Sequence, residues 1–323
     1  MSVHDGSVVR AAPLSERGSG TLQAGALARI PDVCSRLVFP SGIGETESVT
    51  ETGIISTPDG RVLAMCEWGP PDGAPVFFLH GAPGSRLLRH VGGMYERAGA
   101  RVVTYDRPGY GRSTRLPGRQ ISHCAADVAA IADHLNLDTF AMCGASGGGP
   151  HALAVAALLG SRVSRCATIV SFGPYTAPDL DFRAGWPAEE AHQWQLTEQG
   201  GDAVLDVLRA ETAELLEAFP LDGSADAELQ MLAETIAESA IQGIDGRLDD
   251  ELSFVKPWGF DVTDIAVPTQ IMAARDDEMI PATHGRWLVD HIPNAELVTA
   301  PGTHLGFDRH AEEERLIAWL AHG

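Results

Sequence analysis

The chain has 323 residues, of which 44% are hydrophobic, and it carries 44 acidic against 23 basic residues. That length and apolar content are enough for one large core or two small ones. The formal charge of −21 repels phosphate backbones and anionic lipid, so nucleic-acid binding and membrane-surface binding are disfavoured.

The cysteine spacing and the N-terminal sequence bear on the cellular compartment in which the protein is expected. The five cysteines lie far apart, without a C-x-x-C pair or a Cys/His cluster, so we expect neither a disulfide framework nor a zinc site. The N-terminus has no basic patch followed by an apolar run, and no stretch approaches the roughly 18 apolar residues of a membrane span. We therefore expect a cytoplasmic protein. Residues 1–48, rich in Gly, Ser and Ala, are expected to form an N-terminal arm or a disordered leader.

Short apolar runs predict the first strands. Gly53–Thr57 and Arg61–Trp68 flank Pro58-Asp59-Gly60, a turn sequence that predicts a β-hairpin. Four further β-rich runs predict buried strands, at Pro75–Leu79, Arg101–Tyr105, Thr139–Cys143 and Val163–Phe172. Between the second and third of these, apolar residues recur every three or four positions from Ile121 to Leu135, as on one face of a helix. Such alternation indicates an α/β fold, with a mostly parallel twisted sheet and helices on both faces.

The alternation is interrupted by a strongly acidic stretch, residues 173–258, which holds 19 acidic and 4 basic residues. Two helical patterns, Asp202–Phe219 and Ala225–Ile241, occupy it without a convincing strand. The alternation then resumes with a strand at Thr269–Ala273, a helix after Pro281, a strand at Glu296–Thr299 and an amphipathic helix from Asp308. We expect residues 49–172 and 259–323 to form the core, and residues 173–258 to form a helical lid over its catalytic face. The alternative is a second domain with an unrelated role.

The segment Gly144-Ala145-Ser146-Gly147-Gly148 fits the pattern G-x-S-x-G. A β-rich run precedes it, and an Ala-rich helical segment with Pro150 near its start follows it. Glycine is needed two positions before and after the serine because side chains there would collide with the neighbouring strand and helix. This arrangement is a nucleophile elbow, which exposes a serine hydroxyl at the sheet edge, and it predicts Ser146 as a nucleophile.

Four further segments resemble the α/β-hydrolase superfamily. His80-Gly81-Ala82-Pro83-Gly84 resembles the HG-x-PG loop beside the nucleophile, and Asp106–Ser113 is similar to the family's D-x-x-G-x-G-x-S turn. Asp277–Pro281 and Gly302-Thr303-His304 resemble the acid and histidine loops, in the family's order of Ser, Asp and His. The resemblance covers roughly residues 50–323, but none of its motifs falls in residues 173–258. It implies the α/β-hydrolase fold and serine-hydrolase chemistry, in the esterase or proline-iminopeptidase-like branch.

Two departures weaken the peptidase assignment. Proline iminopeptidases have HGGPG in the first loop and tend to have a tryptophan just after the nucleophile, whereas this chain has Ala82 and Gly147. Epoxide hydrolases and haloalkane dehalogenases use an aspartate as nucleophile, and Ser146 argues against both.

A serine hydroxyl needs a base to accept its proton during attack. We predict His304 as that base, because it follows a predicted strand on a loop that can reach the nucleophile. His80 is expected to brace its own loop, and His151 to pack in the helix after the elbow. The family usually places the acid four residues before a proline, which selects Asp277 to orient the imidazole, with Asp276 left open as the alternative.

The family position assigns the two oxyanion donors to the backbone N–H groups of Ala82 and Gly147, since Pro83 has no N–H. The implied reaction is acyl transfer: Ser146 attacks a carbonyl, an acyl-enzyme forms, and water activated by His304 releases the acid. We expect no metal and no cofactor.

Hydrolysis of a carboxylic ester of a small molecule is the leading function. The alternatives among enzymes are an aminopeptidase or amidase of the proline-iminopeptidase type, a carbon–carbon bond hydrolase, and an acyltransferase or cyclase. Outside enzymes, the alternative is a non-catalytic ligand receptor. The expected partner is a small-molecule substrate, without nucleic acid or membrane, and a homodimer stays open.

The large apolar side chains of the acidic stretch are candidates for substrate contact, namely Trp186, Trp194, Phe219, Met231 and Trp258. The alternative is that they only pack this stretch onto the core. Its carboxylates are expected to stay solvated outside, which favours uncharged or cationic esters over anionic ones.

Overall fold

The computed structural model describes residues 50–221, 223–224, 226–305 and 310–323. The predicted arm at residues 1–48 lies outside the described residues, as do the first residues of the helix predicted from Asp308. Within the described part, no helix is long and apolar enough to cross a membrane.

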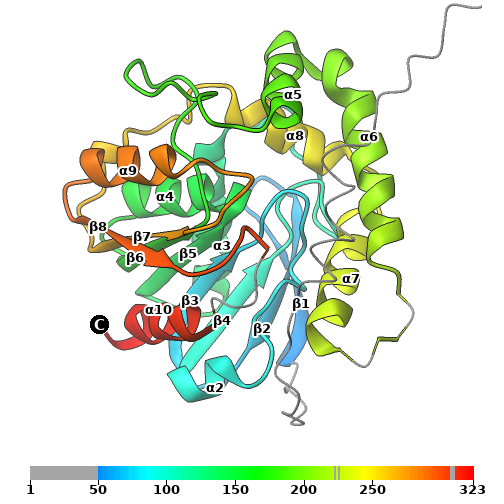
Figure 1. Ribbon diagram of the computed structural model, residues 1–323. Coiled ribbons are helices and arrows are strands. Elements are labelled where there is room, and N and C mark those ends of the chain that lie inside the picture. Colours follow the sequence, from blue (N-terminus) through cyan, green and yellow to red (C-terminus); the bar gives the residue numbers. More distant parts are fainter. Residues whose placement is uncertain (1–49, 222, 225, 306–309) are drawn as a thin grey trace, which may run out of the picture.

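A single eight-stranded sheet forms the centre of the protein, in the spatial order β1-β2-β4-β3-β5-β6-β7-β8 (Figure 1). β1 and β2 pair antiparallel, β2 also pairs antiparallel with β4, and every later pair is parallel. The strands are β1 (Thr50–Ser56), β2 (Val62–Trp68), β3 (Ala74–Leu79), β4 (Ala100–Tyr105), β5 (Phe140–Ala145), β6 (Val163–Ile169), β7 (Thr269–Ala274) and β8 (Ala295–Ala300).

Helices cover both faces of this sheet, and each face has its own apolar core. One core lies under α3 (Cys124–His134), α4 (Gly149–Leu158) and α9 (Ala282–His291), and the other under α2 (Met94–Ala98) and α10 (His310–His322). The sheet residues point alternately to the two cores: Phe77 and Leu79 face the first, and Val76 and Phe78 the second. Burial on both faces is the reason that these strands are apolar along their whole length.

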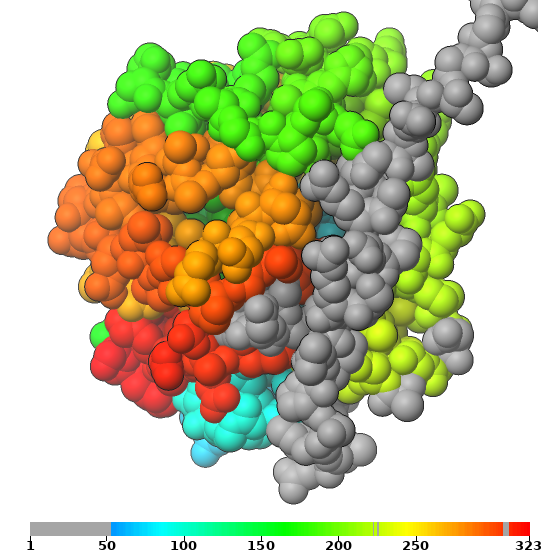
Figure 2. All heavy atoms as spheres, viewed as in Figure 1, coloured from blue at the N-terminus to red at the C-terminus, as the bar shows by residue number. Residues whose placement is uncertain are grey.

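Four helices are inserted between β6 and β7, and in Figure 1 they lie over the top of the sheet and along its β1 side. They are α5 (Ala188–Gln199), α6 (Gly201–Ala218), α7 (Ala227–Ser239) and α8 (Asp245–Phe254). In the space-filling view, the green start of this insertion lies directly against the orange segment that holds β7 and α9 (Figure 2). Side chains join the two, since the Trp287 indole donates to Asp179 and a hydrogen bond of 2.9 Å links Trp186 Nε1 to His284 Nε2.

The α/β fold predicted from the sequence is confirmed, and the predicted strands match β1 to β8 with shifts of a few residues at their ends. Three helices were not predicted: α2, α5 and α8. In α8, five of the ten residues are charged, and this hides the apolar period by which helices are recognised. The cysteines of the described chain, at positions 66, 124, 143 and 166, are buried thiols.

Candidate active site

Ser146 lies directly after β5, at the carboxyl end of the central strands. Its φ of 50° is in the left-handed region, which is unusual for a residue with a side chain and which turns the hydroxyl away from the sheet. The turn is tight enough to require glycine on both sides. A methyl group at Gly144 would lie 2.2 Å from the Gly148 carbonyl oxygen, and one at Gly148 would lie 2.2 Å from the Leu79 carbonyl oxygen.

Three side chains predicted from distant parts of the sequence meet at this turn. His304 Nε2 lies 3.2 Å from Ser146 Oγ. His304 Nδ1 lies 3.2 Å and 3.1 Å from the two carboxyl oxygens of Asp277. Nδ1 therefore carries the proton shared with the carboxylate, and Nε2 is the nitrogen that can accept the proton of the serine. The histidine and the aspartate are both nearly buried, with 5% and 7% of their side-chain surface exposed.

Asp277 follows β7 and is held by the backbone at the start of the next turn. Its Oδ1 accepts hydrogen bonds of 2.9 Å from the N–H groups of Met279 and Ile280. Burial raises the pKa of Asp277, but the hydrogen bond and charge interaction with His304, together with these two N–H groups, outweigh it and leave the pKa below its ordinary value. Asp276, the alternative from sequence, is exposed.

The two predicted oxyanion residues lie side by side. A methyl group added to Gly147 would lie 3.0 Å from Ala82 Cβ and 3.3 Å from the Ala82 backbone nitrogen. Gly81 borders Ser146, since a methyl group there would lie 3.4 Å from Ser146 Cβ. The backbone of the His80 loop therefore approaches Ser146 closely enough for the N–H groups of Ala82 and Gly147 to face one small space.

Two other histidines near the elbow are buried and neutral. His80 Nδ1 donates to the Gly81 carbonyl at 2.7 Å, and its Nε2 accepts from the Arg107 backbone N–H at 3.2 Å. His151 Nδ1 donates to the Gly147 carbonyl at 2.9 Å. Burial, and then the charge of Arg107, lowers the pKa of His151 to about 3 and that of His80 well below its ordinary value. His80 braces its own loop and His151 is packed in α4, in line with the expectations from the sequence.

One nearby serine was missed from the sequence. Ser171, just after β6, donates a hydrogen bond of 2.9 Å to the Ser146 carbonyl oxygen. That carbonyl belongs to the same peptide unit as the Gly147 N–H, so Ser171 holds the peptide unit of one predicted oxyanion donor. The preceding residue, Val170, has a φ of 44°, a strained value for a β-branched side chain. No sequence motif marks a lone serine at the end of a strand.

An aromatic cluster joins the insertion to the core beside the elbow. Phe172 contacts Trp194 and Phe254, with ring centroids 5.6 Å and 5.1 Å away. Trp186 lies 5.4 Å from Trp194, centroid to centroid. Phe254, at the end of α8, reaches the oxyanion residues, because its Cζ would lie 3.0 Å from a methyl group at Gly147. Phe254 and Phe172 were missed because α8 was not recognised and because Phe172 reads as the end of a strand.

The five predicted substrate-contact residues do not form one group. Trp186 and Trp194 belong to the aromatic cluster. Phe219 packs with residues of α7 in a separate small core. Met231 is buried and accepts a hydrogen bond from Thr235 within the same helix, and Trp258 stacks on Phe260.

The expectation that the carboxylates of the insertion stay solvated is wrong for α8. Asp249, Asp250 and Glu251 are all buried, and two of them pair with arginines from the loop after β4. Burial raises the pKa of Glu251 to about 7. Much of the acidic charge of α8 therefore ties the insertion to the core. Among the described residues, no group of three or more His, Cys, Asp or Glu side chains is arranged to hold a metal ion.

The family of the chain follows from its sequence. A family model described as the alpha/beta hydrolase fold matches residues 74–311, which is most of the described chain. The sheet order, the elbow after β5 and the histidine after β8 all agree with this match. The chain belongs to the α/β-hydrolase fold family.

Relatives within this family carry several activities in their names. The chain is 28% identical to a bifunctional esterase/perhydrolase of Acinetobacter calcoaceticus over 265 residues, which are 77% of this chain and 91% of the relative. It is 30% identical to a non-heme haloperoxidase of Rhodococcus erythropolis over 264 residues, 77% of this chain and 90% of the relative. Among solved structures, an esterase from Rhodococcus sp. ECU1013 superposes with a TM-score of 0.60 at 19% identity, covering 84% of this chain and 100% of the esterase.

Proposed function

We propose that the protein is a serine hydrolase that cleaves a carboxylic ester of a small molecule through an acyl-enzyme on Ser146. The observation that carries this proposal is the hydrogen-bonded series Ser146–His304–Asp277 at a strand-to-helix turn with two backbone N–H groups beside it. A nucleophile, a base and a group that orients the base are the minimum set for acyl transfer.

The reaction has two halves. In the first, Ser146 Oγ bonds to the ester carbon while His304 Nε2 takes the hydroxyl proton, and the carbonyl oxygen becomes an oxyanion facing the N–H groups of Ala82 and Gly147. Collapse expels the alcohol, which receives the proton from His304. In the second half, His304 deprotonates water, the hydroxide attacks the acyl-enzyme, and the carboxylic acid leaves as Ser146 regains its proton. None of these steps needs a metal or a cofactor.

The insertion supports a role as a lid, which we propose for residues 173–258. Its last helix brings Phe254 against Gly147, and its first helix brings Trp194 against Phe172, so aromatic side chains border the reacting carbonyl. An apolar wall of this kind suits the acyl or alcohol part of an uncharged ester and keeps bulk water from the oxyanion.

A panel of substrates distinguishes an esterase from an amidase. We would compare kcat/KM for acyl esters of graded length with that for aminoacyl amides, using Ser146→Ala as the control. The proposal predicts turnover of esters, little turnover of amides, and a loss of at least about 10³-fold in Ser146→Ala, as triad knockouts in other hydrolases show. Efficient cleavage of amino-terminal amides instead of esters would favour the aminopeptidase alternative.

A further inference from the structure

Each oxyanion donor belongs to a peptide unit whose carbonyl faces away from the substrate. The Ala82 N–H shares its peptide unit with the Gly81 carbonyl, so whatever holds that carbonyl also aims the N–H. The Gly81 oxygen accepts two hydrogen bonds, one of 2.8 Å from Arg107 Nη2 and one of 2.7 Å from His80 Nδ1. The loop is therefore held from behind by a charged donor and a neutral one.

Arg107 makes further contacts with the same loop. Its Nη1 donates to the His80 carbonyl, and its backbone N–H donates to His80 Nε2 at 3.2 Å. The second of these bonds requires Nε2 to be unprotonated, which leaves the proton on Nδ1, where it bonds to the Gly81 oxygen. With 1% of its surface exposed, Arg107 is as buried as a core residue.

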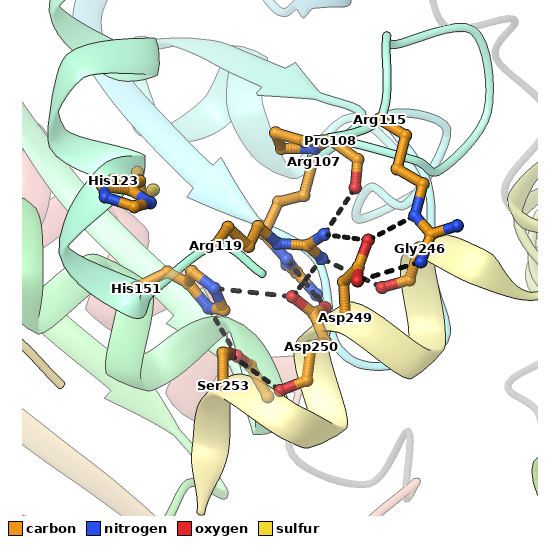
Figure 3. A network of polar contacts seen from close by, with 12 residues as sticks. Arg107, Pro108, Arg115, Arg119, His123, His151, Gly246, Asp249, Asp250 and Ser253 are labelled. Atoms are coloured by element: carbon orange, nitrogen blue, oxygen red, sulfur yellow. Dashed lines mark hydrogen bonds and ion pairs between the residues drawn. The ribbon is translucent and has the colours of Figure 1, made fainter. Parts of the chain in front are cut away.

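The other edge of the Arg107 guanidinium is fixed by the insertion. Nη2 and Nε lie 2.6 Å and 3.1 Å from the same oxygen of Asp250, which is fully buried on α8. The second Asp250 oxygen accepts a 2.5 Å hydrogen bond from Arg119. Figure 3 shows Arg107 and Arg119 pointing from the core loop to Asp250 on the yellow helix, with Arg115 reaching the neighbouring Asp249.

Charge compensation keeps this group ionised. Burial alone would raise the pKa of Asp250, but Arg107 and Arg119 hold it well below its ordinary range. A buried ion pair of this kind adds little net stability compared with apolar residues, because both charges lose their hydration. Stability alone is therefore a weak reason for this arrangement, whereas a fixed orientation of the loop carbonyls is a direct consequence of it.

We propose that Arg107 is a positioning residue that aims and polarises the Ala82 N–H for the oxyanion, and that Asp250 couples this function to the placement of α8. A cation on the Gly81 carbonyl draws electron density from the peptide unit and makes its N–H a stronger donor. Since the anchor of Arg107 lies in the insertion, the oxyanion loop is complete only when α8 is in place. This inference rests on the proposed hydrolase function.

The first test replaces Arg107 with lysine. Lysine keeps the charge and can pair with Asp250, but its single nitrogen lacks the fork that reaches two carbonyls as well. We expect Arg107→Lys to lower kcat on the order of 10- to 100-fold, less than the loss of a whole oxyanion donor, with KM within about threefold. A trifluoromethyl ketone probes the same point, because Ser146 adds to it and leaves an alkoxide in the oxyanion space. Its inhibition constant should rise by the same factor as kcat falls.

A matched pair on α8 separates positioning from stability. Asp250→Asn weakens the anchor of Arg107, and Asp249→Asn is the same change one residue away, at a carboxylate that pairs with Arg115 and Arg119 but does not touch Arg107. We expect Asp250→Asn to lower kcat and the affinity for the ketone about tenfold, consistent with a partial loss of donor alignment. Asp249→Asn should leave both within about twofold.

Three results would overturn the positioning role. The first is that Arg107→Lys and Asp250→Asn fold and keep the kcat and the ketone affinity of the wild type. The second is that Asp250→Asn and Asp249→Asn lose equal factors of kcat and ketone affinity. The third is that Arg107→Lys and Asp250→Asn both fail to fold, which would assign the Arg107–Asp250 pair to stability. Measurements on the wild-type protein distinguish a failure of the positioning role from a failure of the proposed hydrolase function. A wild-type protein that neither hydrolyses esters nor binds the ketone contradicts the hydrolase proposal itself.

Discussion

At the scale of single residues, the candidate site depends on backbone groups as much as on side chains. Asp277 takes two N–H bonds from its own turn, and Ser146 is turned outward by a φ of 50°. These local devices fix side chains that approach one another from sequence positions more than 20 residues apart. Substitutions at the site therefore act on geometry and charge together.

Neighbouring aspartates provide the first prediction. Asp277→Asn places an amide beside His304 Nδ1, which favours the wrong tautomer and removes the charge that stabilises the imidazolium. The equivalent change in a serine protease lowers kcat about 10⁴-fold, and we expect a loss of similar order here. Asp276→Asn, at the exposed neighbour, should stay within several-fold of wild type. Steady-state kinetics on one ester would measure both, and exchanged behaviour of the two variants would reject Asp277 as the acid.

The second prediction concerns the lack of room for a side chain at Gly147, one of the two predicted oxyanion residues. In Gly147→Ala the new methyl group meets Ala82 Cβ and Phe254 Cζ at 3.0 Å, so the loop or α8 must shift and the two N–H groups separate. We expect kcat/KM to fall at least about 10²-fold, comparable to the loss of one oxyanion donor. Gly201→Ala is the control, because its methyl group finds ordinary contacts of 3.5 Å or more. Equal activity of the two variants would argue against Gly147 as part of the oxyanion hole.

The residues of the site could largely be predicted from sequence because each occupies a short motif with a mechanical reason. Ser146 needs its flanking glycines, and Asp277 has a proline four positions later. Ser171 and Arg107 could not be assigned their contacts in this way. Their partners are backbone carbonyls, and any residue supplies a carbonyl, so no pair of residue types in the sequence reveals the bond.

At the scale of elements, α8 is the helix whose role differs most from what its sequence suggests. Its acidic residues suggest a solvated surface, but Asp249 and Asp250 face arginines of the loop after β4. Phe254 at its end reaches the elbow. A charged helix with buried charges has no apolar period, so only the three-dimensional arrangement reveals it.

Charge on the insertion leads to the third prediction. Although part of its acidic charge is paired, exposed carboxylates remain, for example Asp202 and Glu217. We therefore expect a neutral ester to have a higher kcat/KM than its carboxylate-bearing analogue, with the difference growing at low salt, because exposed charges are screened beyond about 8–10 Å at physiological salt. The measurement is the ratio of kcat/KM for the neutral ester to kcat/KM for the anionic ester, taken at two ionic strengths. If the anionic ester has the same kcat/KM as the neutral ester at both ionic strengths, the charge of the insertion has no part in substrate selection.

At the scale of the whole molecule, buried neutral histidines link stability to pH. His284 on α9 joins the start of the insertion to the core through contacts with Trp186 and Gly173, and burial lowers its pKa from 6.5 to about 4. The unfolded chain therefore binds a proton at a pH where the folded chain does not. The contribution of His284 to the free energy of unfolding is complete above about pH 6.5 and is lost as the pH falls toward 4.

The fourth prediction is the size of this effect. Between pH 6.5 and pH 4 the shift corresponds to about 3 kcal/mol of unfolding free energy. Denaturant unfolding at several pH values should show a loss in the wild type to which His80 and His151 also contribute, because burial lowers their pKa values too. In His284→Gln, which cannot take up the proton, the loss should be smaller by about the amount assigned to His284. His192→Gln, at an exposed histidine on α5, should follow the wild type. Identical slopes for all three proteins would contradict the assignment to His284.

Covalent labelling tests the central claim, that Ser146 is an activated nucleophile. A fluorophosphonate reacts with such a serine by forming an oxygen–phosphorus bond and releasing fluoride. We predict one adduct per chain, located by peptide mass spectrometry on Ser146, absent in Ser146→Ala and retained in Ser161→Ala, where the serine is exposed on a turn after α4. Unchanged labelling of Ser146→Ala, or an unlabelled wild type, would contradict the assignment of Ser146 as the nucleophile.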